Sequence, residues 1–273
     1  MFMDQYAVVG HPVSHSKSPQ IHAMFAEQAR QAMAYSAIEA PLDGFEEVVK
    51  EFFQQGGKGL NVTLPFKEQA WALCQNLSER ARLAGAVNTL YLDQQGQLCG
   101  DNTDGLGLVS DLIQQGVGLA GKNILIIGAG GAVKGVIQPI LSEMPACLTL
   151  SNRTQSRADE LVSVFAGHGS ITSLALDQLS QPFDLVINGT SASLGGQLPT
   201  VSRAIFSART VVYDMMYAKG DTVFNAWAKQ QGVGIALDGL GMLVEQAAEA
   251  FLIWRGVRPQ TQEVIKVLRE ASA

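Results

Sequence analysis

The sequence has few cysteines, no cluster of basic residues and no long hydrophobic run. Its three cysteines, Cys74, Cys99 and Cys147, lie far apart and form no CxxC pair, which favours reduced thiols over disulfides or a cysteine zinc site. The formal net charge is -6. Because nucleic-acid binding needs clustered Lys and Arg to neutralise phosphates, we expect no nucleic-acid partner.

The start of the chain also lacks targeting features. The first ten residues, MFMDQYAVVG, carry an acid and no basic residue, unlike a secretory signal peptide. No window reaches the roughly 18 apolar residues of a membrane span. We therefore expect a cytoplasmic protein with no membrane partner. At 273 residues and 47% hydrophobic composition, the chain can bury a large core in one or two domains.

Short β-branched runs alternate with helical patterns between residues 105 and 238. Val223, Phe224 and Trp227, for example, have the spacing of an apolar helix face. Alternating strands and helices predict a parallel sheet covered on both faces, which is a doubly wound domain. Its predicted strands are residues 123–128, 147–152, 170–174, 183–189, 210–215 and 234–239.

The first hundred residues mix strands and helices in the same way. Ser18 is predicted to cap a helix in which Pro19 is the first residue and Ile21, Met24 and Phe25 form the apolar stripe. Two further predicted helices, 239–256 and 259–272, are expected to pack back on this region. The predicted strands are 6–10, 34–39, 59–63 and 88–92, and the predicted domains are 1–104 plus 239–273 and 105–238.

A glycine-rich turn follows the first strand of the doubly wound domain. Gly128, Gly130 and Gly131 stand between a strand and a helix, where a dinucleotide pyrophosphate can approach the backbone and the helix N-terminus. Val133 occupies the third position of the G-x-G-x-x-G/A pattern, so the match is imperfect. A tight strand-to-helix turn without a ligand stays open as the alternative.

The end of the next strand distinguishes the two nicotinamide cofactors. An NAD enzyme usually carries an acid there, whereas this chain reads SNRTQSR. Arg153 and Arg157 can make charge-assisted bonds with a 2'-phosphate, and Asn152 and Thr154 can add neutral ones. The alternative of solvated cations is weakened because basic residues oppose the dipole at a helix start. The sequence therefore favours NADP.

Two polar stretches in apolar surroundings hold the candidates for catalysis. Reduction of a ketone needs a proton for the developing alkoxide, and Lys67 beside the carboxylate of Asp104 can deliver it. A structural salt bridge remains the alternative. His11, His15 and His22 do not suggest a metal site, because prolines interrupt any helix through them and no carboxylates accompany them; we expect capped or solvated loop histidines and no metal.

Eight motifs in order carry a resemblance over essentially the whole chain: HSKSP, NVTLPFK, AGAVNTL, GDNTDG, GAGGA, NRT, DMMY and GLGMLVEQAA. The sequence resembles the shikimate dehydrogenase family. The resemblance implies an NADP(H)-dependent oxidoreductase that interconverts 3-dehydroshikimate and shikimate, on the pathway to chorismate and the aromatic amino acids. It also implies a substrate-binding α/β domain, a Rossmann-like NADP domain with a cleft between them, and a monomer or homodimer.

The resemblance also implies a role for individual residues. Lys67 and Asp104 form the catalytic pair, Ser14 and Ser16 bind the substrate carboxylate, and Tyr217 closes over it. The groups around the substrate hydroxyls are Asn61, Thr63, Asn88 and Gln246. The cofactor-binding residues are Gly128, Ala129, Gly130, Gly131, Ala132, Asn152, Arg153, Thr154, Arg157, Asn188, Thr190, Ser191, Met215 and Gly239.

Two departures from the usual family wording accompany these matches. Val133 and Lys134 replace small residues or Ser/Arg pairs, and Gly189 replaces the usual alanine. We expect Lys134 to alter cofactor affinity and Gly189 to loosen its loop. Two other functions stay open: a broader quinate/shikimate dehydrogenase that accepts NAD, and a non-catalytic sensor on the same fold.

Overall fold

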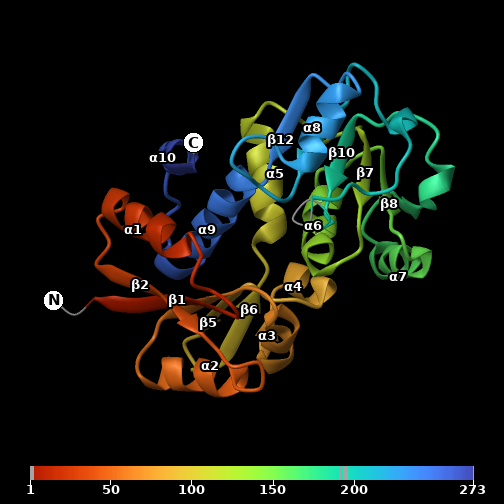
Figure 1. Cartoon of the computed structure of the whole chain (residues 1–273). Helices are drawn as coiled ribbons and strands as arrows, with labels where there is room; N and C mark the ends of the chain where they lie inside the picture. The colour runs from red at the N-terminus through yellow and green to blue at the C-terminus, as the bar shows by residue number, and fades with distance from the viewer. Residues whose placement is uncertain (1–2, 191, 193–195, 273) are drawn as a thin grey trace. The chain divides into compact units, whose positions relative to one another are not determined.

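The computed structural model describes residues 3–190, 192 and 196–272, and its chain folds into two compact units (Figure 1). The first unit comprises Met1–Gly107 and Val244–Lys266, and the second comprises Leu108–Leu243 and Val267–Ala273. The chain passes from one unit to the other within helices α5 (Asp104–Gln114), α9 (Leu240–Arg255) and α10 (Gln262–Ser272). Among the described residues, no helix has the length and apolar character needed to span a membrane.

The first unit is built on a mixed sheet of six strands in the order β2-β1-β3-β5-β6-β4. β1 pairs in parallel with β2 and β3, whereas β5 runs antiparallel to both β3 and β6. The elements are β1 (Asp4–Gly10), α1 (Ser18–Gln28), β2 (Met33–Glu39), α2 (Phe45–Gln54), β3 (Gly59–Val62), α3 (Lys67–Leu73), β4 (Asn76–Leu77), α4 (Glu79–Ala84), β5 (Thr89–Leu92) and β6 (Leu98–Asp101).

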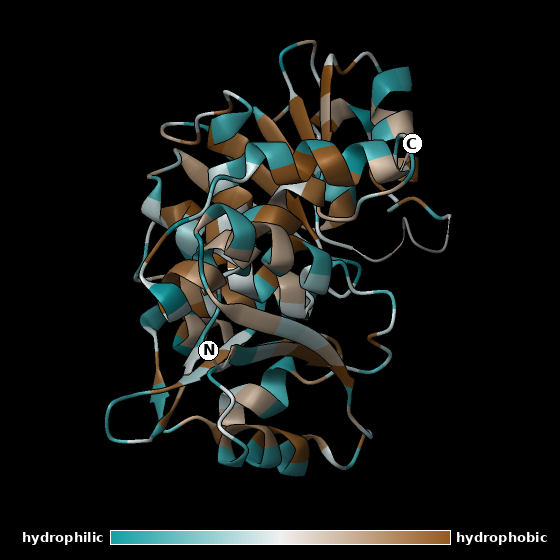
Figure 2. Ribbon diagram, turned by 90° about the vertical axis from the view of Figure 1, so that its left-hand side faces the viewer, coloured by the Kyte–Doolittle hydropathy of each residue, from teal (hydrophilic) through white to brown (hydrophobic). Residues whose placement is uncertain are grey.

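Apolar residues of the central strands form the core of this unit. Val9, Leu60 and Leu90 are fully buried and pack with Phe45 and Phe66 from the helical layer. In Figure 2 hydrophobic and hydrophilic residues alternate along the helices, and several strands are largely hydrophobic. β1 has a neighbouring strand on each side and is buried from Tyr6 to Gly10.

The second unit is a parallel sheet of six strands in the order β12-β11-β10-β7-β8-β9. In chain order within the unit this is the arrangement of dinucleotide-binding Rossmann folds, whose direction of winding reverses between β7 and β10. The elements are β7 (Asn123–Ile127), α6 (Gly131–Ser142), β8 (Cys147–Ser151), α7 (Gln155–Phe165), β9 (Ile171–Ser173), β10 (Leu185–Asn188), β11 (Val211–Asp214), α8 (Val223–Gln230), β12 (Ile235–Asp238) and the short 3-10 helices η1 (Leu176–Gln178) and η3 (Arg203–Ile205).

All six strands predicted for the second unit and all four predicted for the first are confirmed. The predicted cap of α1 is wrong, because the helix begins at Ser18 itself, and the Ser16 hydroxyl accepts the Ser18 N–H at 3.3 Å. His22 is also not a solvated loop histidine. It lies in α1, fully buried, and stacks on Tyr35. Val223, expected on an apolar helix face, is 37% exposed.

Candidate active site

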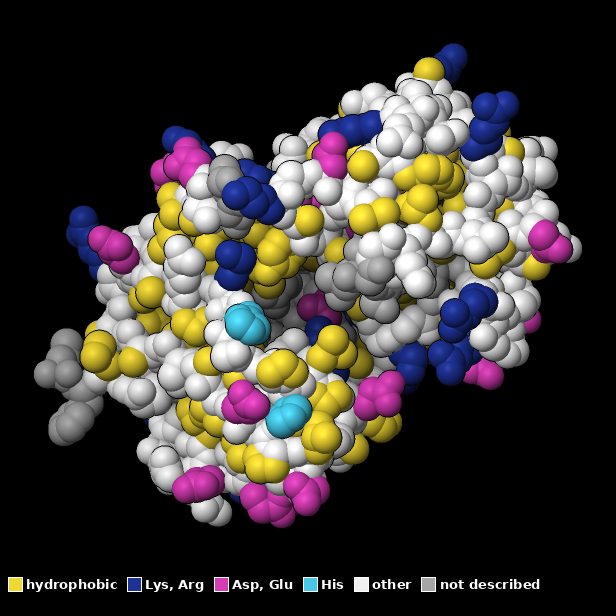
Figure 3. Space-filling model, viewed as in Figure 1, with side chains coloured by type: hydrophobic (Ala, Val, Ile, Leu, Met, Phe, Trp, Pro, Cys, Tyr) yellow, Lys and Arg dark blue, Asp and Glu magenta, His cyan; other side chains and the backbone are white. Residues whose placement is uncertain are grey.

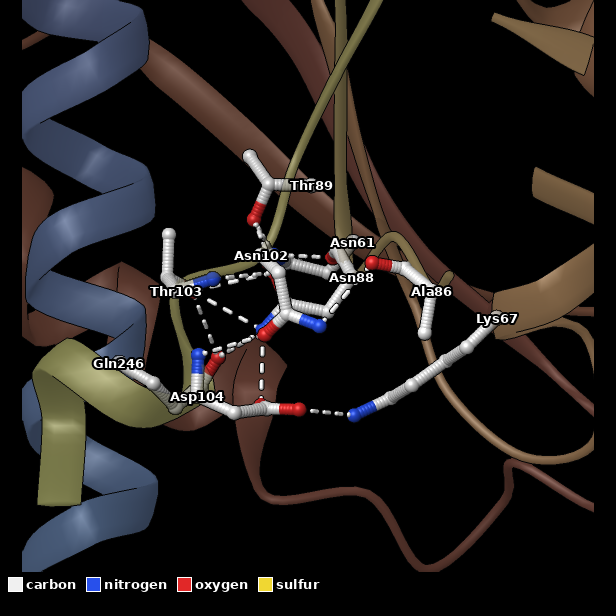
Figure 4. A network of polar contacts seen from close by, with 9 residues as sticks. All are labelled: Asn61, Lys67, Ala86, Asn88, Thr89, Asn102, Thr103, Asp104 and Gln246. Carbon is white, nitrogen blue, oxygen red and sulfur yellow. Dashed lines mark hydrogen bonds and ion pairs between the residues drawn. The ribbon is translucent and has the colours of Figure 1, made fainter. Parts of the chain in front are cut away.

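A polar network lies among the buried strands of the first unit (Figure 4). Asn61 comes from β3, and Asn88 directly precedes β5. Asn102 and Thr103 link β6 to α5, while Lys67 and Asp104 are the first residues of α3 and α5. Strand ends and helix starts therefore deliver side chains from four separate segments to one place.

The two predicted catalytic residues are in direct contact. Lys67 Nζ donates to Asp104 Oδ2 at 2.6 Å, and the side chains are 21% and 9% exposed. A charge-assisted hydrogen bond this short holds the ammonium in one position. The exposed fraction of Lys67 leaves its proton accessible to a ligand, so the pair has the geometry of a proton donor with its anchor.

The other oxygen of the Asp104 carboxylate is held by Asn88. Asn88 Nδ2 donates to Asp104 Oδ1 at 2.8 Å and to Thr103 Oγ1 at 2.9 Å. Asn88 Oδ1 accepts the Thr103 backbone N–H at 2.9 Å. Asn88 is only 2% exposed, and both of its amide hydrogens have acceptors within the protein. Its visible effect is therefore to fix the carboxylate that faces Lys67.

An ion pair fixes the segment that leads into Asp104. Arg80, in α4, makes two bonds to Asp101 at the end of β6, Nε to Oδ1 at 2.7 Å and Nη2 to Oδ2 at 2.6 Å. The Ser78 hydroxyl and the Asn102 N–H also donate to Asp101 Oδ1. A bidentate guanidinium on a buried carboxylate is a rigid contact, so it restrains the chain just before Asp104.

The remaining residues predicted to contact substrate have different environments. Ser14 is exposed in the loop after β1, Thr63 is half-buried after β3, and within the described residues neither hydroxyl makes a hydrogen bond. Gln246, in α9, lies close to the network, with Oε1 3.4 Å from Asn88 Nδ2. Tyr217 belongs to the second unit, where it is 37% exposed and burial raises the pKa of its hydroxyl.

The glycine turn of the second unit connects β7 to α6, as expected. Gly128 has a φ of +123°, a conformation that favours glycine, and β-carbons at Gly130 and Gly131 would meet no atom within 4 Å. The backbone of this turn is therefore open to a ligand, and α6 begins at Gly131 with no side chain capping its first N–H groups. Both features suit a pyrophosphate.

The ends of β10 and β11 lie beside this turn at the reversal point of the sheet. Asn188 Oδ1 accepts from the Thr190 hydroxyl at 2.8 Å, and Asn188 Nδ2 donates to Asp214 Oδ1 at 3.1 Å. Met215 N–H donates to Asn188 O at 2.9 Å. A β-carbon at Gly239 would collide with the Met215 carbonyl. Four of the predicted cofactor residues thus come together, while the fifth, Ser191, lies outside the described residues.

The expected 2'-phosphate region forms one wall of a surface pocket in the second unit. Arg153 and Arg157 are exposed, and neither makes an ion pair within the described residues. Asn152 Nδ2 is bonded to Thr154 O at 2.9 Å. Figure 3 shows Lys and Arg side chains gathered at the lower right, where α7 lies in the matching view of Figure 1. The pocket is lined by Asn152, Arg153, Gln155, Ala175, Leu176, Asp177, Thr200, Val201 and Ser202.

Two of the unusual residues of the sequence are neighbours. A β-carbon at Gly189 would overlap the Val133 side chain and lie 3.2 Å from Met215 Sδ. Val133 is fully buried. The space that alanine would need at position 189 is already filled by valine, and the expected loosening of this loop stays a prediction.

Sequence reasoning missed four residues that bond to the predicted site residues. Thr89, Asn102 and Thr103 are fully or almost fully buried and each bonds a predicted site residue. Tyr35, from β2, donates to Asn61 Oδ1 at 2.7 Å. Thr89, Asn102 and Thr103 stand inside or beside quoted motifs, so adjacency could have identified them. Tyr35 stands in a strand with no such signal.

Three family models match the chain: the shikimate dehydrogenase substrate binding domain over residues 8–90, shikimate / quinate 5-dehydrogenase over 111–196, and the shikimate 5'-dehydrogenase C-terminal domain over 239–269. A shikimate dehydrogenase (NADP(+)) from Hahella chejuensis is 58% identical over 98% of this chain and 99% of its own.

Solved structures agree with these matches. An Ael1 enzyme from Pseudomonas putida superposes with a TM-score of 0.93 and 43% identity, covering 97% of this chain and 98% of its own. The shikimate 5-dehydrogenase of Thermus thermophilus, solved with NADP(H) and shikimate, has a TM-score of 0.86 and 32% identity, covering 98% of this chain and 100% of its own. On this combination of sequence match, fold and site geometry, the chain belongs to the shikimate dehydrogenase family.

Proposed function

We propose that the protein is an NADP-dependent oxidoreductase that reversibly reduces 3-dehydroshikimate to shikimate in the shikimate pathway. The observation that carries the proposal is the Lys67–Asp104 pair, whose Nζ and Oδ2 atoms are 2.6 Å apart in a network of buried amides. Relatives that are 55–58% identical over nearly their whole length carry the name of this activity.

The chemistry of the network suits the reduction of a ketone. A bound NADPH would supply the hydride for this reduction. As negative charge develops on the carbonyl oxygen, the Lys67 ammonium donates a proton to it, forming the hydroxyl, and neutral Lys67 then regains a proton from solvent. Asp104 holds the ammonium in place for this transfer. In the oxidation direction, neutral Lys67 accepts the hydroxyl proton.

Substrate recognition is assigned to the polar groups around this pair. Ser14 and Ser16 lie in the loop before α1 and are proposed to bind the carboxylate, which Tyr217 covers. Asn61, Thr63, Asn88 and Gln246 are proposed to surround the ring hydroxyls. The free hydroxyls of Ser14 and Thr63 among the described residues support these roles, since a ligand can use them without breaking a protein contact.

Cofactor binding is assigned to the second unit. The open backbone at Gly130 and Gly131 supports the pyrophosphate position, and Ala129 and Ala132 belong to the same turn. Arg153 and Arg157 are proposed to hold the 2'-phosphate with Asn152 and Thr154. Asn188, Thr190, Met215 and Gly239 would border the nicotinamide, together with Ser191. The corresponding domains are residues 1–104 plus 239–273 for substrate and 105–238 for NADP.

Initial rates with purified protein test the proposal, measured by nicotinamide absorbance with shikimate or quinate and with NADP or NAD in all four pairings. Turnover confined to shikimate with NADP supports it. Turnover with quinate and NAD assigns the protein to the broader quinate/shikimate class, and no turnover in any pairing, together with measurable ligand binding, makes it a sensor.

Cellular location and assembly are further parts of the proposal. Three cysteines without a disulfide suit a reducing compartment, so we place the enzyme in the cytoplasm. We propose a monomer or homodimer that needs no macromolecular partner, which light scattering after size exclusion measures directly.

A further inference from the structure

Tyr35 occupies the strand β2 and belongs to none of the motifs that define the site. Its ring stacks on His22 with centroids 4.2 Å apart and planes 7° apart. Its hydroxyl donates to Asn61 Oδ1 at 2.7 Å. Asn61 is 6% exposed, so Tyr35 contacts a residue at the edge of the substrate site from the side of the protein core.

The contacts of Asn61 determine which way its amide faces. Nδ2 lies 3.1 Å from the backbone oxygen of Asn88 and 3.3 Å from Thr89 Oγ1. A backbone carbonyl can only accept, so the nitrogen must face Asn88 and the oxygen must face Tyr35. With both hydrogens donated, Asn61 can engage a further group only through Oδ1, which the Tyr35 hydroxyl already contacts and which the buried ring of His22 also approaches. Asn61 therefore presents an acceptor.

A series of hydrogen bonds leads from Asn61 to the Lys67–Asp104 pair. Thr89 Oγ1 accepts from Asn61 and donates to Asn88 Oδ1 at 2.8 Å. Asn88 Nδ2 donates to Asp104 Oδ1 at 2.8 Å. Thr89 has one hydroxyl hydrogen and directs it to Asn88, so reversing the amide of Asn61 would leave Thr89 facing an acceptor where a donor stands now. Buried networks are stable only when every member is satisfied.

The Tyr35 hydroxyl keeps its proton over the working range of an enzyme. Burial raises its pKa well above the ordinary value, and a hydrogen bond from Ser18 partly offsets that rise. The Tyr35 hydroxyl therefore keeps a hydrogen to donate to Asn61, whereas an ionised carboxylate in this position could only accept.

We propose that Tyr35 is a positioning residue whose hydroxyl holds the Asn61 amide with its oxygen available to a substrate hydroxyl. Tyr35 acts through Asn61 and does not itself touch the substrate. The claim that Tyr35 holds Asn61 depends only on the contacts between β2 and β3. The claim that the donor to Asn61 is a hydroxyl of shikimate rests on the proposed function. The site would thus recognise a ring hydroxyl as a hydrogen-bond donor.

The variant Tyr35→Phe removes the hydroxyl and keeps the ring on His22. Tyr91→Phe is the matched control, since Tyr91 is a half-buried tyrosine of the same sheet whose hydroxyl has no hydrogen bond within the described residues. The first measurement is solvent exchange of the Asn61 side-chain amide by NMR, with the resonances assigned from Asn61→Asp. We expect exchange to accelerate about tenfold or more in Tyr35→Phe, the effect of losing one buried hydrogen bond, and no change in Tyr91→Phe.

Steady-state kinetics form the second measurement. In Tyr35→Phe we expect KM for shikimate to rise about three- to tenfold, with kcat and KM for NADP little changed. Shikimate analogues in which a non-reacting ring hydroxyl is replaced by fluorine, which cannot donate, should be discriminated against by the natural enzyme and less so by Tyr35→Phe. In the Asn61→Ala background, Tyr35→Phe should have no further effect on KM.

Two results overturn the proposal, each in a different way. Equal behaviour of Tyr35→Phe and Tyr91→Phe in the exchange experiment would show that Tyr35 does not hold Asn61. Faster exchange with an unchanged KM and unchanged fluorine discrimination would show that Asn61 does not accept from the substrate. If the natural protein turned over no shikimate, the proposed function would fail. The exchange experiment would still show whether Tyr35 holds the Asn61 amide.

Discussion

The side chain of Val133, in the first turn of α6, occupies the space into which a β-carbon on Gly189 would project. The two positions depart together from the usual family wording, one gaining volume and the other losing it. Their contact explains why both changes occur in one chain. The loop after β10 keeps its packing because the missing methyl of residue 189 is replaced by a methyl of residue 133.

This relationship predicts a non-additive pair of mutations. Gly189→Ala should destabilise the protein by about 1–3 kcal/mol through overpacking, and Val133→Ala should destabilise it by a similar amount through a cavity. The double variant should cost clearly less than the sum. Urea unfolding of the four proteins measures this, and strict additivity would show that the two side chains do not share the space.

Removing the Lys67 ammonium should abolish turnover without abolishing binding. We expect Lys67→Ala to lower kcat by about 10²- to 10⁴-fold, the usual contribution of a positioned acid, and to leave substrate affinity within about tenfold, or ~1.4 kcal/mol. Stopped-flow and equilibrium binding separate the two quantities. A parallel loss of binding and rate would instead identify Lys67 as a residue that positions the substrate.

Cofactor selectivity should depend on the two exposed arginines near α7. Arg153→Ala and Arg157→Ala should each raise KM for NADP by about tenfold or more, because a charge-assisted bond to the 2'-phosphate is lost. KM for NAD should stay the same, since NAD lacks this group. Arg209→Ala, an exposed arginine just before β11 at the amino ends of the strands, is the matched control. An equal rise in KM for NADP and NAD would show that these arginines do not bind the 2'-phosphate.

Buried His22 should make the protein sensitive to acid. Burial lowers its pKa from 6.5 to about 3 in the folded state, whereas the unfolded chain binds a proton below its ordinary pKa. Between these values the unfolded state holds more protons, so stability falls as pH decreases, by about 1.4 kcal/mol per pH unit from this residue. Denaturant unfolding at pH 6, 5 and 4 should show a smaller slope for His22→Phe, and an unchanged slope for exposed His168→Gln.

Local pattern was enough to predict the second unit in detail. Its parallel strands are short β-branched runs, such as residues 123–127, that end at a glycine or a polar residue. The reversal of winding between β7 and β10 places Gly128 next to Asn188 and Gly189, and both positions were among the candidates. A strand that is buried on both faces is apolar along its length, so its position can be recognised from composition alone.

The first unit was less predictable because distant segments determine it. β4 has two residues, Asn76 and Leu77, and its pairing with β6 leaves no local signal. The local sequence around His22 does not predict that this side chain is buried. It is buried because Tyr35 and Trp254, from other elements, pack against it. The amide orientation of Asn61 likewise depends on a strand that is adjacent only in space.

The division of the chain also has a consequence for its synthesis. Helix α9 contributes Trp254, whose Nε1 donates to Leu90 O at 3.2 Å, and Arg255, which bonds Asp4 at the start of β1, to the first unit. A ribosome therefore makes residues 108–243, most of the second unit, before the first unit has the helix that completes it. We expect the later domain in the sequence to fold first, and the earlier one to wait, with its strands exposed to chaperones, until α9 leaves the exit tunnel.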